Sequence, residues 1–100
     1  MVKHIILWNL RDEFSAEEKE NIKAGIKEGL EGLAGKIEGL TDIKVNINGL
    51  ATSTADLMLD STFESEAALK AYSTNPLHQN VADTRVRPFT KLRSCLDFEI

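Results

Sequence analysis

The sequence has 100 residues, of which 42% are hydrophobic and 28% are charged, and its formal net charge at neutral pH is −4. This size and composition predict a single globular domain over residues 1–100. The mixed, slightly acidic charge disfavours nucleic-acid binding, and no apolar run is long enough to span a membrane. A single cysteine excludes a disulfide within the chain, and we see no secretion signal, so we expect a cytoplasmic protein.

The first apolar run, from Val2 to Trp8, is rich in β-branched residues and predicts a strand. Side chains alternate along a strand, so His4, Ile6 and Trp8 share one face. The opposite face is also largely apolar, and we therefore expect a central strand that is covered on both sides.

A long amphipathic helix is predicted next. It opens with the capping-box sequence Ser15–Glu18, and apolar residues then follow helical spacing as far as Ile37, over about five turns. Gly25, Gly29 and Gly32 lie on one flank of the apolar stripe. They either allow the helix to pack closely or leave room for a ligand, and the sequence alone does not separate these alternatives.

The rest of the chain reads as two strands, two helices and a closing strand. The expected ranges are Asp42–Asn48, Ala55–Phe63, Glu64–Ser73, a helix from Asn75 to about Pro88, and Cys95–Ile100. The order predicts an α+β, ferredoxin-like βαββαβ fold in which an antiparallel sheet carries both long helices on one face.

The other sheet face should then be bare and apolar. We assign to it Ile5, Leu7, Ile43 or its neighbours, Met58, Leu96, Phe98 and Ile100. A chain of this length has no second layer to cover such a face, so we expect a second copy to cover it and the homodimer to form an α/β barrel.

One of only two histidines, His78, lies in the first turn of the helix that Asn75 and Pro76 open. The start of a helix favours the neutral imidazole, which can act as a general base, and Tyr72 is near in sequence as a hydrogen-bond donor. The nearby segment from Arg85 to Arg93 is locally basic. It either holds an acidic group of a ligand or forms a solvated helix face.

Several segments together resemble the stress-responsive α/β barrel (Dabb) family. They are Met1–Leu7, Thr62–Ser65, Tyr72, Asn75–His78 and Leu96–Phe98. The resemblance covers essentially the whole chain, and the Lys-His start and the Asn-Pro-x-His segment are its most specific parts. It implies a ferredoxin-like homodimer whose two sheets form a shared barrel.

One plant member of that family, olivetolic acid cyclase, is a polyketide cyclase without a cofactor, and the resemblance implies that Tyr72 and His78 form the catalytic pair. It also implies a ligand-binding cavity lined by His4, Ile6, Trp8, Ile22, Ile26, Leu57, Leu59, Val81 and Cys95, with polar Ser61 in the same row. Arg93 is a further candidate for this cavity. Because Trp8 stands where a smaller aliphatic would leave more volume, we expect a small aromatic or enolisable ligand rather than a long alkyl-bearing polyketide.

Three functions stay open on the sequence alone. The first is a cofactor-free lyase, cyclase or isomerase; the second is a non-catalytic, ligand-binding or stress-associated dimer; the third is a cofactor-free monooxygenase-like enzyme. Motifs for metals, phosphates and dinucleotides are missing, so we expect no cofactor and no metal. Plain structural roles also remain open: His4 as a hydrogen-bonded core histidine, Cys95 as a buried small hydrophobe, and Asp56 and Asp60 as partners of lysines.

Overall fold

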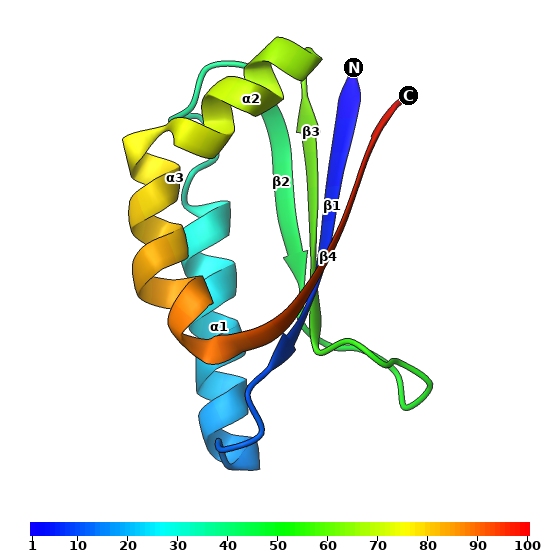
Figure 1. The fold of residues 1–100 in the computed structure, drawn as a ribbon, viewed down its shortest axis with the longest axis vertical. Coiled ribbons are helices and arrows are strands. Elements are labelled where there is room, and N and C mark those ends of the chain that lie inside the picture. Colours follow the sequence, from blue (N-terminus) through cyan, green and yellow to red (C-terminus); the bar gives the residue numbers. More distant parts are fainter.

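Four antiparallel strands form one sheet with the order β2-β3-β1-β4, and the helices cover one of its faces (Figure 1). This computed structural model describes residues 1–100. In chain order the elements are β1 (Val2–Leu10), α1 (Ala16–Glu31), β2 (Leu40–Asn46), β3 (Leu57–Phe63), α2 (Glu66–Thr74), α3 (Pro76–Val81), a π-helical turn (Ala82–Val86), a 3-10 turn (Arg87–Phe89) and β4 (Thr90–Glu99). The predicted ferredoxin-like α+β fold is confirmed.

The central strand β1 pairs with β3 on one edge and with β4 on the other. Its alternate residues Val2, His4, Ile6, Trp8 and Leu10 are all buried beneath the helices. This is the face that the sequence assigns to His4, Ile6 and Trp8, and it supplies one wall of the space between the sheet and the helices.

Helix α1 begins as predicted but is shorter than the apolar spacing suggests. Ser15 forms a complete capping box with Glu18, and the helix ends at Glu31 rather than near Ile37. The apolar residues beyond Glu31, including Ile37, are buried from within turns, so they keep the helical spacing without the helix. Gly35 and Gly39 have φ angles of 76° and 83°, a conformation that glycine adopts without strain and that ends regular helix.

Among the glycines on the flank of α1, Gly29 allows close packing against the segment after α2. A Cβ at Gly29 would lie 2.7 Å from Cδ of Arg85 and 3.0 Å from Cγ1 of Val81, so this glycine lets the α3 segment approach α1 closely. Gly25 has open space around it. Neither glycine lines the large cavity described below.

Asn75 forms a sharp corner between α2 and α3. Its backbone N–H closes the last turn of α2 by donating to the Tyr72 carbonyl, while its side chain accepts from the N–H of Leu77 at 2.9 Å. Pro76 occupies the first turn of α3, where no hydrogen bond is lost. The corner brings His78 back against Tyr72, because the chain reverses between the two helices.

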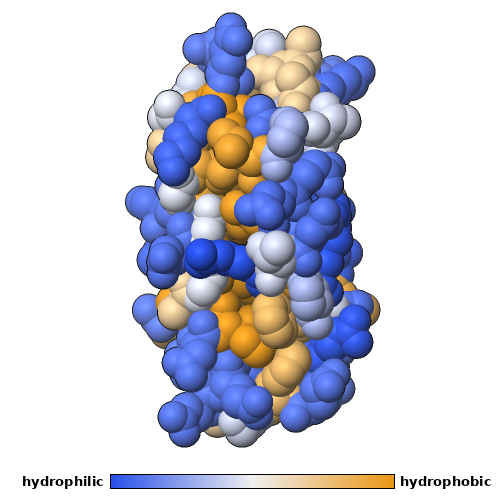
Figure 2. All heavy atoms as spheres, turned by 90° about the vertical axis from the view of Figure 1, so that its left-hand side faces the viewer, coloured by the Kyte–Doolittle hydropathy of each residue, from blue (hydrophilic) through white to orange (hydrophobic).

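The outer face of the helical layer is largely hydrophilic, with apolar side chains visible mainly in a band along its middle (Figure 2). No helix combines the length and the apolar character that crossing a bilayer requires.

The opposite face of the sheet is not covered by any element of the chain (Figure 1). Large apolar side chains are exposed there: Leu7, Leu92, Leu96, Phe98 and Ile100. Lys3 and Asp60 form an ion pair across this face at 2.8 Å. Of the alternatives given as Ile43 or its neighbours, Ile43 was wrong: it is buried on the helical side, opposite Ser61 and in phase with Val45, whereas its neighbour Lys44 lies opposite Asp60 on the uncovered face.

Replacing Gly39 by alanine should destabilise the fold more than the same change at Gly35. Both positions have positive φ, which costs a residue with a Cβ about 1–2 kcal/mol. A Cβ at Gly39 would in addition lie 2.5 Å from the Cβ of Ala68, whereas Gly35 faces open space. We expect Gly39→Ala to lower the free energy of unfolding by about 2–4 kcal/mol and Gly35→Ala by about 1 kcal/mol. Urea denaturation measures both, and equal losses would contradict the role of Ala68.

Candidate functional site

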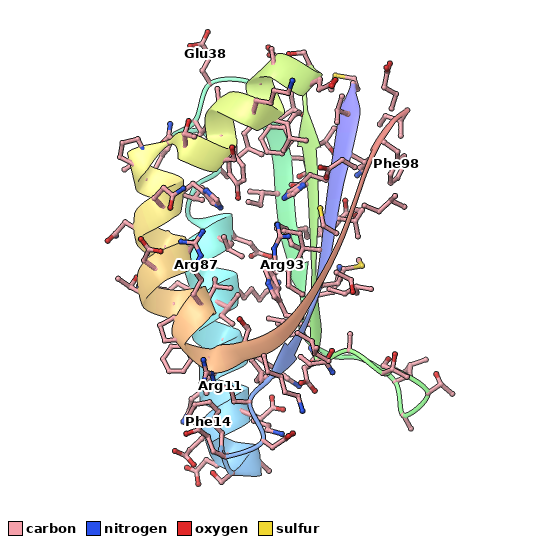
Figure 3. All side chains as sticks on the ribbon, in the orientation of Figure 1. Arg11, Phe14, Glu38, Arg87, Arg93 and Phe98 are labelled. Carbon is pink, nitrogen blue, oxygen red and sulfur yellow. The ribbon has the colours of Figure 1, made fainter.

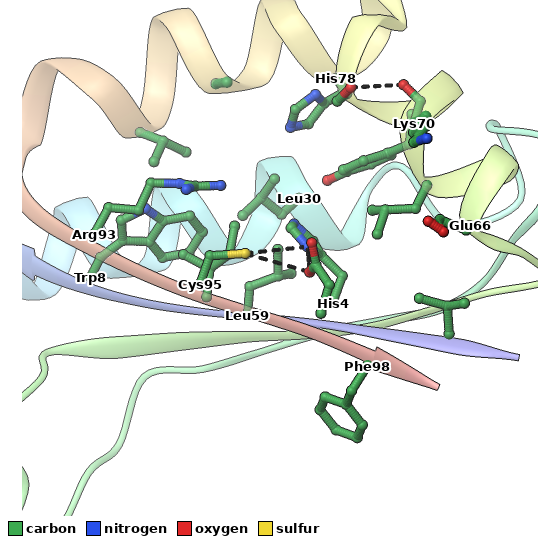
Figure 4. Close-up of a pocket in the computed structure, with 18 of the residues that line it drawn as sticks. His4, Trp8, Leu30, Leu59, Glu66, Lys70, His78, Arg93, Cys95 and Phe98 are labelled. Atoms are coloured by element: carbon green, nitrogen blue, oxygen red, sulfur yellow. Dashed lines mark hydrogen bonds and ion pairs between the residues drawn. The ribbon is translucent and has the colours of Figure 1, made fainter. Parts of the chain in front are cut away.

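A cavity of about 690 Å³ lies between the sheet and the helical layer (Figure 4). Strands β1 and β4 form its floor, and α2, α3 and the turns after α3 form its roof. Its lining includes Val2, His4, Ile6, Trp8, Leu30, Leu59, Glu66, Leu69, Lys70, Tyr72, Ser73, His78, Ala82, Val86, Arg87, Thr90, Arg93, Cys95, Asp97 and Glu99. The cavity therefore has an apolar centre with charged groups around it.

Tyr72 is held on the inner face of α2 and is 1% exposed. Its ring lies 4.9 Å from that of Phe63 and 6.2 Å from that of His4, measured between ring centroids. No protein group hydrogen-bonds its hydroxyl, which is buried. Burial raises the pKa of the phenol, so the hydroxyl keeps its proton at neutral pH and can only act as a neutral donor or acceptor.

His78 stacks on Tyr72 with a centroid separation of 4.1 Å and an interplanar angle of 32°. Its Nδ1 is buried and has no hydrogen-bond partner in the protein. Burial lowers the pKa of His78, a backbone contact with Ser73 acts in the opposite direction, and the charges of Arg87, His4 and Arg93 lower it further. The lowered pKa agrees with the expectation for a helix start, but burial is its main cause. The imidazole is thus neutral at physiological pH and offers a free nitrogen.

His4 approaches the same space from the floor. Its Nδ1 lies 2.5 Å from Oδ1 of Asp97 on the neighbouring strand β4. The paired strands place the two residues directly opposite each other. The carboxylate orients the imidazole, because a carboxylate accepts from the ring N–H and fixes its rotation.

Cys95 completes a cluster with this pair. Its Sγ lies 3.8 Å from Nδ1 of His4 and 3.4 Å from Oδ1 of Asp97. The prediction that Cys95 is buried was wrong: the residue is exposed, because it lines the cavity instead of packing against the helices. Partial burial, together with the Asp97 carboxylate, raises the pKa of the thiol, so Cys95 is a weak nucleophile at neutral pH.

The same three residues are the only group here with the donor types of a metal site, and their ligand atoms lie within 4.8 Å of one another. Around tetrahedral zinc, with bonds of about 2.0–2.3 Å, ligand atoms lie roughly 3.3–3.7 Å apart. The separation of 2.5 Å between His4 and Asp97 is that of a hydrogen bond instead. The arrangement is a hydrogen-bonded cluster rather than a preformed metal centre.

The structure brings seven of the twelve residues in the expected site to this cavity: His4, Ile6, Trp8, Leu59, Tyr72, His78 and Cys95. The other five lie elsewhere. Ile26, Leu57 and Ser61 are buried in the core, Val81 packs near Gly29, and Ile22 lies at a separate depression between α1 and the turns after α3. Ser61 faces the helices as expected, but its hydroxyl donates to the backbone carbonyl of His4 at 2.9 Å and is not free for a ligand.

Asp97, Glu66 and Lys70 also line the cavity, and the sequence did not single them out for it; Arg87, from the basic segment that the sequence offered as a possible holder of an acidic group, lines it too. Asp97 could be found only from the register between the first and last strands, which sets it opposite His4. Glu66 and Lys70 are one helical turn apart on α2, a spacing that signals a shared face but not a cavity. The carboxylates Asp56 and Asp60 have structural roles: Asp56 accepts from the N–H of Leu10, and Asp60 pairs with Lys3.

The family model of the Stress responsive A/B Barrel Domain (Dabb) matches residues 2–100. The chain belongs to this family. The resemblance in the Lys-His start and the Asn-Pro-x-His segment is thereby confirmed at the level of the family. No curated protein sequence matches the chain.

Solved structures similar to this A/B barrel domain share its fold over nearly the whole chain. A dimeric protein of unknown function from Bacteroides fragilis, with a ferredoxin-like fold, is 33% identical with a TM-score of 0.91; the match covers 99% of this chain and 95% of that one. A hydroxynitrile lyase from Passiflora edulis is 17% identical (TM-score 0.73, covering 99% and 92%). An antibiotic biosynthesis monooxygenase is 9% identical (TM-score 0.75, covering 100% and 98%). The last two likenesses concern the fold alone.

The pKa of His78 in the A/B barrel domain should lie below its ordinary value of about 6.5, since burial and nearby positive charges disfavour the protonated ring. Titration of the ring resonances by NMR measures this pKa, and His78→Gln assigns them by removing one of two histidine signals. A His78 pKa at or above about 6.5 would contradict the environment described here.

The same shift links stability to pH. Below about 6.5 the unfolded chain binds a proton at residue 78 that the folded chain does not bind, so acid favours unfolding until the lowered folded pKa is passed. Urea denaturation should therefore show a smaller loss of stability between about pH 7 and pH 5 in His78→Gln than in the wild type.

Proposed function

We propose that this protein is a cofactor-free lyase or isomerase that acts on a small enolisable or aromatic molecule, with His78 as general base and Tyr72 as hydrogen-bond donor. The observation that carries the proposal is the pair of stacked rings at the cavity, each with a buried polar atom that no protein group satisfies. A buried polar atom without a partner costs about 1–3 kcal/mol. A ligand that hydrogen-bonds both atoms would recover this cost.

The protonation states of the two groups suit this chemistry. A neutral His78 can accept a proton on Nδ1 from a carbon or hydroxyl of the substrate. Tyr72 keeps its proton and can donate it in a hydrogen bond to the substrate oxygen on which negative charge develops. His4, held by Asp97, supplies a third polar contact from the floor of the cavity. General-base catalysis of this kind contributes roughly 10²–10⁴-fold.

The similar structures are consistent with such a role, since one of them is a hydroxynitrile lyase. Another is a monooxygenase, and the monooxygenase-like function expected from the sequence stays an alternative. A non-catalytic binding protein is the other alternative; it needs the same cavity and predicts binding without turnover.

We also infer that the protein is a homodimer that buries the uncovered sheet face and closes an α/β barrel. The exposed apolar side chains on β1 and β4, with Leu96 64% exposed and Phe98 41% exposed, form more apolar surface than a single chain usually leaves in water. The similar protein from Bacteroides fragilis is dimeric. A permanent interface of this kind buries more than about 2,000 Å² in total.

The catalytic proposal predicts proton abstraction that depends on His78. The substrate is unknown, so the probe is a panel of small phenols, lactones, β-keto acids and hydroxynitriles, tested by thermal shift for binding. The compounds that bind are then incubated in D₂O and followed by NMR for exchange or cleavage. We expect His78→Gln to slow the reaction by about 10²–10⁴-fold and Tyr72→Phe by about 10²–10³-fold. Asn80→Ala, exposed on the same helix, is the matched control and should react like the wild type.

Stability separates catalysis from a structural role in this experiment. Tyr72→Phe keeps the ring and its stacking but removes a hydroxyl that has no partner, so the free energy of unfolding should stay the same or rise. Slower reaction together with unchanged stability supports the proposal. Compounds that bind, with no exchange or cleavage by the wild type, would instead support the non-catalytic alternative.

The dimer prediction is tested by placing a charge in the centre of the uncovered face. Leu96→Glu should shift the protein from dimer to monomer in light scattering at micromolar concentration, because a carboxylate is costly to bury in an apolar interface. Leu77→Glu, at an exposed leucine on α3, is the control and should remain dimeric. A wild-type protein that is monomeric in this measurement would contradict the inference.

A further inference from the structure

Arg93 occupies one end of the cavity. It lies directly opposite Trp8 in the pairing of β1 and β4, so the two side chains share the face below the helices. Figure 3 places Arg93 between the sheet and the helical layer, with Arg87 on the helical layer beside it. Figure 4 shows Arg93 next to Trp8, at the opposite end of the cavity from Glu66.

Arg93 is the cation at this end that no carboxylate neutralises. Arg87 forms an ion pair with Asp83 and also contacts the side chain of Gln79. None of the seven ion pairs in the structure involves Arg93. This end of the cavity therefore carries a net positive charge.

No acidic residue of the cavity forms an ion pair with this guanidinium. On the cavity face of β4, Cys95 separates Arg93 from Asp97, and Glu99 follows Asp97 further along the strand. Asp97 is in addition engaged by His4. Arg93 thus faces a space that an anion can enter without meeting an unpaired carboxylate nearby.

The floor beside Arg93 is apolar. Trp8 is 4% exposed and Ile6 5% exposed, and both line the cavity together with Leu59. On the cavity face of β1, Trp8 lies opposite Arg93 and is followed toward the N-terminus by Ile6 and His4, whose ring lies 6.2 Å from that of Tyr72. A ligand that satisfies every part of this surface has an anionic head and a flat apolar body. One guanidinium with two parallel N–H groups matches a carboxylate, whose two oxygens accept both.

We propose that Arg93 is the carboxylate-binding residue of the cavity and that its ligands are small monocarboxylic acids with a planar apolar body. The proposal deepens, and rests on, the proposed function, because it sets the substrate's carboxylate at Arg93 and its reacting part beneath Tyr72 and His78. Binding of the acid does not itself require turnover.

The test measures binding of benzoate and of benzamide, its neutral isostere, by calorimetry at constant ionic strength. Wild type should bind benzoate at least about tenfold more tightly than benzamide, as expected for a charge-assisted hydrogen bond. Arg93→Gln should weaken benzoate at least about tenfold and leave benzamide unchanged, and Arg93→Lys should recover part of the loss. Arg11→Gln, which removes an exposed arginine outside the cavity, is the matched control and should bind benzoate like the wild type.

The NMR titration of His78 gives a second readout that a merely structural arginine would not move. Because the charge of Arg93 lowers the pKa of His78, Arg93→Gln should raise that pKa, and benzoate should raise it in the wild type but not in Arg93→Gln. Equal benzoate affinity of wild type and Arg93→Gln, equal affinity of wild type for benzoate and benzamide, or no benzoate binding up to tens of millimolar would each overturn the proposal.

The two proposals fail separately. His78→Gln should still bind benzoate, because it keeps Arg93 and the apolar floor. Benzoate binding by wild type in the absence of any proton abstraction would reject the catalytic role and keep the carboxylate site. Proton abstraction that is unaffected by Arg93→Gln, with neutral substrates preferred, would reject the carboxylate site and keep the catalytic role of His78.

Discussion

A single layer of helices has to cover a four-stranded sheet, and it covers only part of it. Helices α1 and α2 bury the helical side of β2, β3 and β1, while β4 remains exposed along nearly its whole length. The cavity forms over β1 and β4, where α2, α3 and the turns after α3 lie above the sheet but the side chains of β4 have no helix packed on them. The same shortage of helices leaves the other sheet face apolar and open.

The environment of the cavity assigns different states to groups of similar chemistry. Tyr72 is deeply buried and stays protonated, and His78 is partly buried beside arginines and stays neutral. His4, by contrast, has a carboxylate within hydrogen-bond distance. The two histidines of this small site thus have different partners: the ring of His4 is held by a carboxylate, whereas Nδ1 of His78 has no hydrogen-bond partner in the protein.

Local patterns in the sequence predicted those features that local physics determines. The phase of β1 follows from strict alternation, and the Asn75-Pro76 corner places His78, so the amino-acid pattern alone was enough to predict both. The length of α1 could not be predicted in this way, because Leu33 and Ile37 continue the helical spacing after Gly32 has capped the helix. The spacing of apolar residues indicates which positions are buried, and buried residues in turns can have the same spacing as those on one face of a helix.

Which residues line the cavity depends on contacts between segments that are far apart in the sequence, and the spacing of residues along the chain does not specify these contacts. Leu57 and Leu59 are equivalent in the alternation of β3, and only the position of the helices above the sheet puts Leu59 in the cavity and Leu57 in the core. Asp97 meets His4 across 93 residues of sequence. Whether Arg93 lies on a solvated face or in a cavity is likewise decided by the register of β4 against β1, which no local pattern specifies.

The two ends of the chain lie side by side, since β1 and β4 are antiparallel neighbours and the N–H of Ile100 donates to the carbonyl of Met1 (Figure 1). Fraying that starts at these ends breaks the hydrogen bonds between β1 and β4 one after another, beginning with the bond between Ile100 and Met1. The contact between His4 and Asp97 lies only a few residue pairs from that end. Local unfolding, which begins where strands are exposed and terminal, would therefore dismantle the floor of the cavity while the core beneath α1 remained intact.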